Sequence, residues 1–157
     1  MSEWADLPII YDELLESDGF TFITNKNVLL KNDNYIQYGR YSVANDVGHF
    51  WVREFSNNEE LRKILNQGIS AAMAYFDVIE EQNPLLAPLN PTFGGWIKNG
   101  NTLIIDIVSV YRDLKHALTM GQMYKQEAIF DFKTMKEIKV FSHSDSEAYL
   151  YNKIQNL

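Results

Sequence analysis

The chain has 157 residues, of which 46% are hydrophobic and 13% aromatic, and it carries a net charge of −7 with no cysteine. A disordered chain is excluded, because such chains are poor in aromatic and apolar residues. The length fits one domain, which we place at residues 1–157. The absence of cysteine rules out disulfides, thiolate metal sites and cysteine nucleophiles. The acidic balance disfavours nucleic acid as a partner, since contacts to phosphate supply most of that affinity.

The first eighty residues are predicted to form a short helix, an antiparallel β-meander and one long helix. Apolar residues at helical spacing predict the short helix over residues 7–16. Glu59 and Glu60 favour the start of the long helix, capped by Ser56 or Asn57, and its apolar stripe over 57–81 is expected to pack on the sheet. Between the helices, four short runs are separated by Asn, Asp and Gly, a pattern typical of a meander: residues 20–24, 28–30, 35–43 and 49–55.

A proline-rich segment follows the long helix at residues 84–91 and contains three prolines and three leucines. A residue that precedes proline avoids the helical region, so the helix is predicted to end at Asn83. We expect Leu85, Leu86 and Leu89 to hold the segment against the body of the protein. The alternative to a single domain is a division into two small lobes near residues 84–91.

The remaining residues predict a hairpin, a helix and a second hairpin in the same domain. The first hairpin turns at Asn99-Gly100, the strongest short signal for a two-residue turn. Gly94-Gly95 lacks the spacing of a phosphate loop and is typical of a bulge or a close backbone approach. The predicted elements are strands at 92–97 and 103–111, a helix at 113–126, strands at 128–132 and 137–140, and a capped terminal helix from Ser144. The fold class is therefore α+β.

A candidate binding surface lies on the predicted meander. With period-two alternation, His49, Trp51 and Arg53 share one face of a strand, and the expected neighbouring strand presents Tyr38 and Arg40. Tyr, Trp and Arg are the usual hot-spot residues of protein interfaces. The same residues also allow two other interpretations, an ordinary solvated sheet face and an anion or acid–base site.

The block from Gly94 to Val140 resembles the C-terminal part of small uncharacterised bacteriophage proteins. This resemblance depends on the Gly-Gly-Trp hairpin and on the strand sequence Gln126-Glu127-Ala128-Ile129-Phe130-Asp131. The resemblance implies a phage or mobile-element origin and assigns no active site.

We therefore expect a phage-type accessory protein that binds another protein, either a host factor or a defence component. A virion structural component is one alternative, and a small enzyme or nucleotide-binding protein that uses Arg40, His49 and Arg53 is another. No catalytic residue, metal or cofactor is expected, because the histidines and serines lack catalytic or metal-binding spacing. No apolar run reaches membrane-spanning length, so we expect the host cytoplasm or the virion as the location. Self-association is left open.

Overall fold

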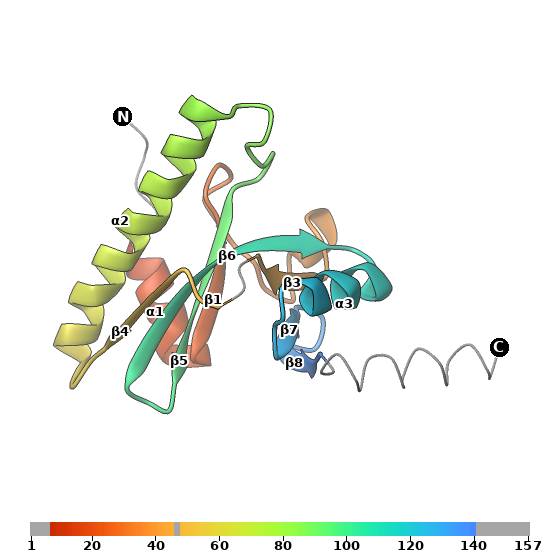
Figure 1. Ribbon diagram of the computed structural model, residues 1–157. Helices are drawn as coiled ribbons and strands as arrows, with labels where there is room; N and C mark the ends of the chain where they lie inside the picture. The colour runs from red at the N-terminus through yellow and green to blue at the C-terminus, as the bar shows by residue number, and fades with distance from the viewer. Residues whose placement is uncertain (1–6, 46–47, 141–157) are drawn as a thin grey trace. The chain divides into compact units, whose positions relative to one another are not determined.

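The computed structural model describes residues 7–45 and 48–140, which form an α+β fold of helices and antiparallel strands (Figure 1). The chain divides into two compact units. Unit 1 comprises Met1–Leu30 and His49–Ser109, and unit 2 comprises Lys31–Gly48 and Val110–Leu157. Residues 84–91 lie inside unit 1 rather than at a boundary. The single folding domain over 1–157 stays a prediction, and so does the alternative division near 84–91.

Unit 1 combines two helices with an antiparallel sheet. Its strands are hydrogen-bonded in the order β2-β1-β5-β6-β4. Asn99 and Gly100 have φ angles of 55° and 74°, so the β5–β6 hairpin turns where the sequence predicts. The elements are α1 (Leu7–Ser17), β1 (Gly19–Ile23), β2 (Val28–Leu29), β4 (Trp51–Glu54), α2 (Asn58–Gln82), β5 (Thr92–Lys98) and β6 (Thr102–Tyr111), the last of which continues into unit 2.

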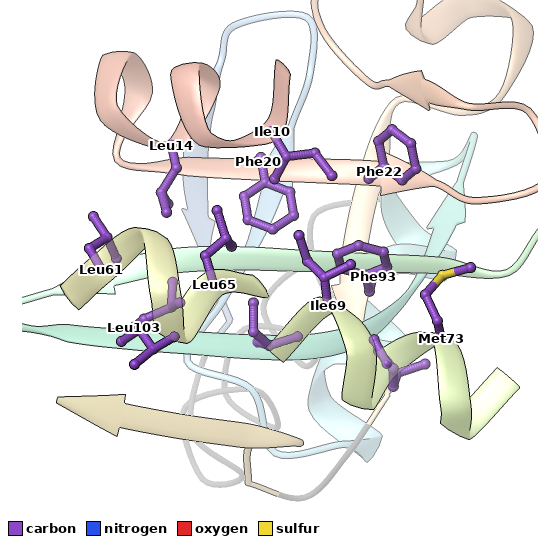
Figure 2. Close-up of a cluster of buried hydrophobic side chains, with 14 of the residues drawn as sticks. Ile10, Leu14, Phe20, Phe22, Leu61, Leu65, Ile69, Met73, Phe93 and Leu103 are labelled. Carbon is purple, nitrogen blue, oxygen red and sulfur yellow. The ribbon is translucent and has the colours of Figure 1, made fainter. Parts of the chain in front are cut away.

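The core of unit 1 lies between the two helices and one face of this sheet (Figure 2). The predicted apolar stripe of α2 is buried, and its N-terminus is capped by the Asn57 side chain, which accepts a hydrogen bond from the Glu60 N–H at 2.8 Å. Figure 2 shows side chains of both helices gathered against the strands. The labelled members are Ile10 and Leu14 of α1, Phe20 and Phe22 of β1, Leu61, Leu65, Ile69 and Met73 of α2, Phe93 of β5 and Leu103 of β6.

Two glycines set the distances in this core. A Cβ added to Gly68 of α2 would lie 3.0 Å from the ring of Trp51 and from Ile105, so the helix approaches the sheet closely. A Cβ added to Gly95 of β5 would overlap the ring of the buried Phe20. The pairing of β5 with its neighbours is continuous through Gly94-Gly95, so this pair marks a close approach and not a bulge.

Unit 2 is smaller and packs one helix on a few strands. β3 pairs with β7, and β7 pairs with β8 in a hairpin. A second core forms where α3 meets these strands, with Tyr41, Val43, Ala117 and Ile129 buried. The elements are η1, a 3-10 turn (Tyr35–Gln37), β3 (Tyr41–Ala44), α3 (Leu114–Met123), β7 (Ala128–Asp131) and β8 (Lys136–Lys139). The terminal helix predicted from Ser144 lies outside the described residues.

The predicted meander is wrong in its pairing, although short antiparallel strands form in all four runs. Of the four predicted meander strands, β1 and β2 pair with each other, whereas β1 also pairs with β5, β3 pairs with β7 and β4 pairs with β6. The run 35–43 is divided, because Tyr35–Gln37 forms a 3-10 turn and Gly39 takes a φ of 144° that breaks the extended chain. Alternation identifies strands and their buried faces, but it does not identify their partners.

Replacing Gly95 with alanine should destabilise the protein by about 1–3 kcal/mol, because the new methyl group overpacks the ring of Phe20. Urea unfolding measures the loss. The double variant Gly95→Ala with Phe20→Leu should lose less than the sum of the single variants, since the smaller side chain leaves room for the methyl group. Full additivity would show that the two residues do not compete for this space.

Limited proteolysis within residues 84–91 should not release two separate stable halves. The segment joins α2 to β5, and both elements contribute to the same core. After cleavage the two fragments should therefore elute together in native size-exclusion chromatography and separate only in denaturant. Separate elution of two folded fragments without denaturant would instead support the division into lobes near this segment.

Candidate functional site

Arg40, the first candidate in unit 2, lies just before β3 and forms a two-point ion pair with Asp131 at the end of β7. Its Nε donates to Asp131 Oδ1 at 2.8 Å, and its Nη2 donates to Oδ2 at 2.9 Å. The Asp131 side chain is 3% exposed and the Arg40 side chain 34%. The hydrogen bonds from Arg40 are the largest cause that holds the pKa of Asp131 below its ordinary value. Arg40 is therefore committed to a structural pair, while part of its guanidinium reaches the surface.

Tyr38, the other candidate in unit 2, ends the 3-10 turn η1 instead of belonging to a strand. Its backbone N–H donates to the carbonyl of Tyr35 at 2.9 Å. Its side chain is half-buried. The predicted alternation of Tyr38 with Arg40 along one strand is therefore wrong, because the chain is not extended at this point.

Trp51 and Arg53 lie on β4 in unit 1 and share one face, as predicted. The Trp51 ring packs at Gly68 of α2. The Arg53 guanidinium lies 4.9 Å from the centre of the Trp51 ring, and its Nη1 donates to the carbonyl of Val52 at 2.8 Å. This stacked and hydrogen-bonded arginine covers the tryptophan and part of the strand backbone.

His49 precedes β4 and turns to the opposite face of the sheet. Its Nδ1 lies 3.2 Å from Oδ1 of Asp106 on β6, a side chain that is 8% exposed. The same oxygen accepts the backbone N–H of Phe50 at 3.3 Å, and the ring of Trp96 lies 6.1 Å from the His49 ring. Burial is the largest influence on Asp106 and raises the pKa of its carboxyl group. The prediction that His49 shares a face with Trp51 is wrong. Trp51 lies opposite Ile105, whereas His49 contacts Asp106, and these two consecutive residues of β6 point to opposite faces of the sheet.

The five predicted binding residues thus fall into two groups. Tyr38 and Arg40 belong to unit 2, whereas His49, Trp51 and Arg53 belong to unit 1. The expected strand pairing that would join them does not form, because β3 pairs with β7 and β4 with β6. Within each group the polar side chains are largely engaged in contacts that order the fold. That these five residues bind a partner stays a prediction.

The loop between α2 and β5 carries the most exposed apolar residues of unit 1. Leu85, Leu86 and Leu89 are 98%, 77% and 93% exposed. We call residues 83–91 the leucine loop. The expectation that these leucines hold the loop against the protein body is wrong, because their side chains point into solvent. The prolines and the absence of helical spacing identified the loop from the sequence, but nothing in the pattern showed which way the leucines face.

Hydrogen bonds fix the backbone of the leucine loop although its apolar side chains are exposed. The N–H and Oγ1 of Thr24 both donate to the carbonyl of Pro91 at 2.9 Å. Asn25 Nδ2 donates to the carbonyl of Leu89 at 2.9 Å, and the Leu86 N–H donates to the carbonyl of Asn83 at 2.9 Å. The loop is therefore tied to the turn between β1 and β2 and presents its leucines from an ordered backbone.

Unit 2 contains a second feature that the sequence did not reveal, a small hollow beside η1. It has a volume of about 200 Å³ and is lined by Tyr35, Ile36, Gly39, Arg40 and Arg112. Arg112 donates to the carbonyls of Ile36 and Gln37, each at 2.8 Å. No sequence signal joins Arg40 to Arg112, which are 72 positions apart.

Comparison with known proteins gives no relative from which a role could be inferred: no family model, curated protein or solved structure matches the chain. Across residues 7–45 and 48–140, no group of three or more His, Asp or Glu side chains is arranged to hold a metal ion. Within the same ranges, no helix has the length and apolar character needed to cross a membrane. The functional inference therefore depends on the surfaces described above.

Acid should weaken the fold partly through Asp131. Because the folded-state pKa of this group is below its ordinary value of 3.8, the stabilisation it gives is present above that value. It is lost as the pH falls through the folded-state pKa. Arg40→Gln removes the main cause of the low pKa of Asp131. As the pH is lowered from about 5 to about 2, the free energy of unfolding of this variant should therefore fall less steeply than that of the wild-type protein.

Urea unfolding over this pH range measures the effect. Lys133→Gln is the matched control, since it removes a neighbouring positive charge but keeps the ion pair and the backbone N–H that Asp131 accepts. Equal pH dependence in the wild-type protein and Arg40→Gln would contradict the assignment of the low pKa to Arg40.

Proposed function

We propose that this protein acts by binding another protein through the leucine loop. The observation that carries the proposal is the nearly complete exposure of Leu85, Leu86 and Leu89 on a backbone fixed by hydrogen bonds. Single exposed apolar residues are ordinary on protein surfaces, whereas a group of them marks an interaction site.

The energetics support an interaction site. Burying one leucine side chain contributes roughly 1.5–3 kcal/mol, so three leucines provide the apolar centre that a specific interface needs. The ordered backbone and the prolines Pro84, Pro88 and Pro91 reduce the entropy lost on binding, because the loop does not need to be ordered again. A loop with these properties resembles a preformed ligand for a groove.

The charges near the loop indicate the chemistry of the partner. Glu80 and Glu81 are exposed in the last turn of α2, which contains no basic residue, and the chain as a whole carries −7. We therefore infer a partner with an apolar groove for the leucines and basic residues at its rim. Charges at the rim of an interface mainly guide association and specificity, while the apolar centre supplies the affinity.

The resemblance to small bacteriophage proteins, which stays an expectation, makes host factors, defence components and virion proteins the first partners to test. A catalytic role has weaker support. Arg40, His49 and Arg53, the residues of the enzymatic alternative, each have an interaction partner within their own unit. Their arrangement stabilises the fold without any need for a substrate.

Replacing all three leucines, Leu85→Ser, Leu86→Ser and Leu89→Ser, should weaken partner binding by at least about tenfold. Partners are first identified by crosslinking and mass spectrometry in host lysate and in purified particles, and affinities are then measured with the purified partner. Thermal stability should change little, because the replaced side chains are exposed.

Ile36→Ser is the matched control, since Ile36 is an aliphatic side chain that is 73% exposed in unit 2. Unchanged affinity in the triple variant would reject the leucine loop as the contact. If Arg53→Ala instead abolishes binding, the partner binds β4 and the candidate residues predicted from the sequence gain support.

A further inference from the structure

The hollow beside η1 contains two arginines that approach the same small volume from different parts of unit 2. Arg40 reaches it from the residue before β3, and Arg112 from the residue after β6. Tyr35, Ile36 and Gly39 complete the lining. Asp131, the carboxylate that pairs with Arg40, is not among the lining residues. The lining therefore contains two positive charges and no acidic side chain.

Each guanidinium group is held in place by part of its hydrogen-bonding capacity. A guanidinium has five N–H donors. Toward the described residues, Arg40 uses its Nε and Nη2 for Asp131, and Arg112 uses its two Nη atoms for the carbonyls of Ile36 and Gln37. Each group thus keeps donors beyond those bonds. Because both groups are already oriented, a ligand would not need to order them.

The positive charge and the size of the hollow together restrict the class of ligand. Asp131 pairs with Arg40 and offsets its charge, which leaves the charge of Arg112 among the lining residues. Arginine pairs favour oxyanions, which accept several N–H donors at once. A volume of about 200 Å³ is below the roughly 300–1,000 Å³ of pockets that enclose whole small molecules.

We propose that the hollow formed by Tyr35, Ile36, Gly39, Arg40 and Arg112 is a binding site for a phosphate group. The phosphoryl oxygens accept hydrogen bonds from the two guanidinium groups, and the remainder of a phosphorylated ligand lies outside the hollow. The site belongs to unit 2 and does not depend on the leucine loop, so the two proposals can fail separately.

A purely structural role for Arg112 is the main competing explanation. Its bonds to the carbonyls of Ile36 and Gln37 satisfy acceptors at the end of η1, a common role for arginine at the end of a helical turn. The test must therefore change the hollow without removing either arginine. Ile36 permits this, because the residue lines the hollow and is 73% exposed.

Ile36→Glu introduces a carboxylate beside the two guanidinium groups, and Ile36→Gln is the uncharged control. Binding of inorganic phosphate is followed by NMR titration of the backbone amides of Gly39 and Arg40 and the Nε–H groups of the arginines, against sodium chloride at equal ionic strength. Ile36→Gln supplies the reference affinity, because it makes a similar change of side-chain shape at the hollow without adding a charge. Ile36→Glu should bind at least about tenfold more weakly, since like charges oppose each other.

A second variant tests the donors directly. Arg112→Gln should weaken phosphate binding by about tenfold to a hundredfold, whereas Lys139→Gln, which removes an exposed charge on β8, should not. The amide signals of Tyr38 and Gly39 report whether η1 keeps its structure in Arg112→Gln. If η1 is disturbed, the Ile36 pair decides the question.

Two further probes distinguish the sources of the phosphate group. Phosphoserine and a nucleoside monophosphate are titrated under the same conditions, and whichever binds more tightly than inorganic phosphate identifies the kind of molecule to which the group belongs. Equal affinity for all three supports recognition of the phosphoryl group alone. The proposal is wrong if phosphate causes no more change than chloride, or if Ile36→Glu binds phosphate as well as Ile36→Gln does.

Discussion

The structure of unit 1 depends on the burial of one face of α2 against the sheet. Leu61, Leu65 and Ile69 form part of the stripe that covers the apolar face of β1, β5 and β6. Gly68 allows a close approach, since an added Cβ would lie 3.0 Å from Trp51 and Ile105. Because apolar burial is the dominant favourable term in folding, the positions of α1 and of the strands follow from this contact. The helix itself ends at Gln82, before Asn83-Pro84, where the leucine loop begins.

Two buried carboxylates play the same structural part in the two units. In unit 2, Asp131 on β7 pairs with Arg40, the residue immediately before β3. In unit 1, Asp106 on β6 binds His49 and the Phe50 N–H, immediately before β4. Each carboxylate lies on the strand that pairs with the one about to begin. Each carboxylate contact therefore fixes the point at which a strand enters its sheet.

Local patterns in the sequence predicted the helices, the Asn-Gly hairpin and the α+β class. These features depend on residues close in the chain, such as the Asn57 cap and the 3.6-residue period of α2. The partners of β1, β3 and β4 could not be predicted, because any strand with a suitable apolar face satisfies the same alternation. Phe22 lies opposite Phe93, and Tyr41 lies opposite Asp131, pairings that no local signal records.

The same limit applies to the candidate surfaces. Arg40, His49 and Arg53 have the residue types of a binding patch, yet their polar groups already have partners within the fold. Arg40 pairs with Asp131, His49 contacts Asp106, and Arg53 stacks on Trp51 and donates to the carbonyl of Val52. The leucines of residues 84–91 have the composition of a buried segment, yet they are exposed. The direction in which a side chain points depends on hydrogen bonds to distant residues, here Thr24 and Asn25.

The pairing of β1 with β5 has a consequence for how the chain folds during synthesis. Phe20 and Phe22 lie on a strand whose long partner begins only at Thr92, some seventy residues later. Contacts that join such distant residues form slowly, because a long loop must close before they contribute. Until β5 has left the ribosome, β1 lacks its main partner strand, and the apolar stripe of α2 has no complete sheet to pack against. The growing chain therefore exposes apolar surface that a chaperone can recognise, and the order of synthesis itself delays the formation of the first core.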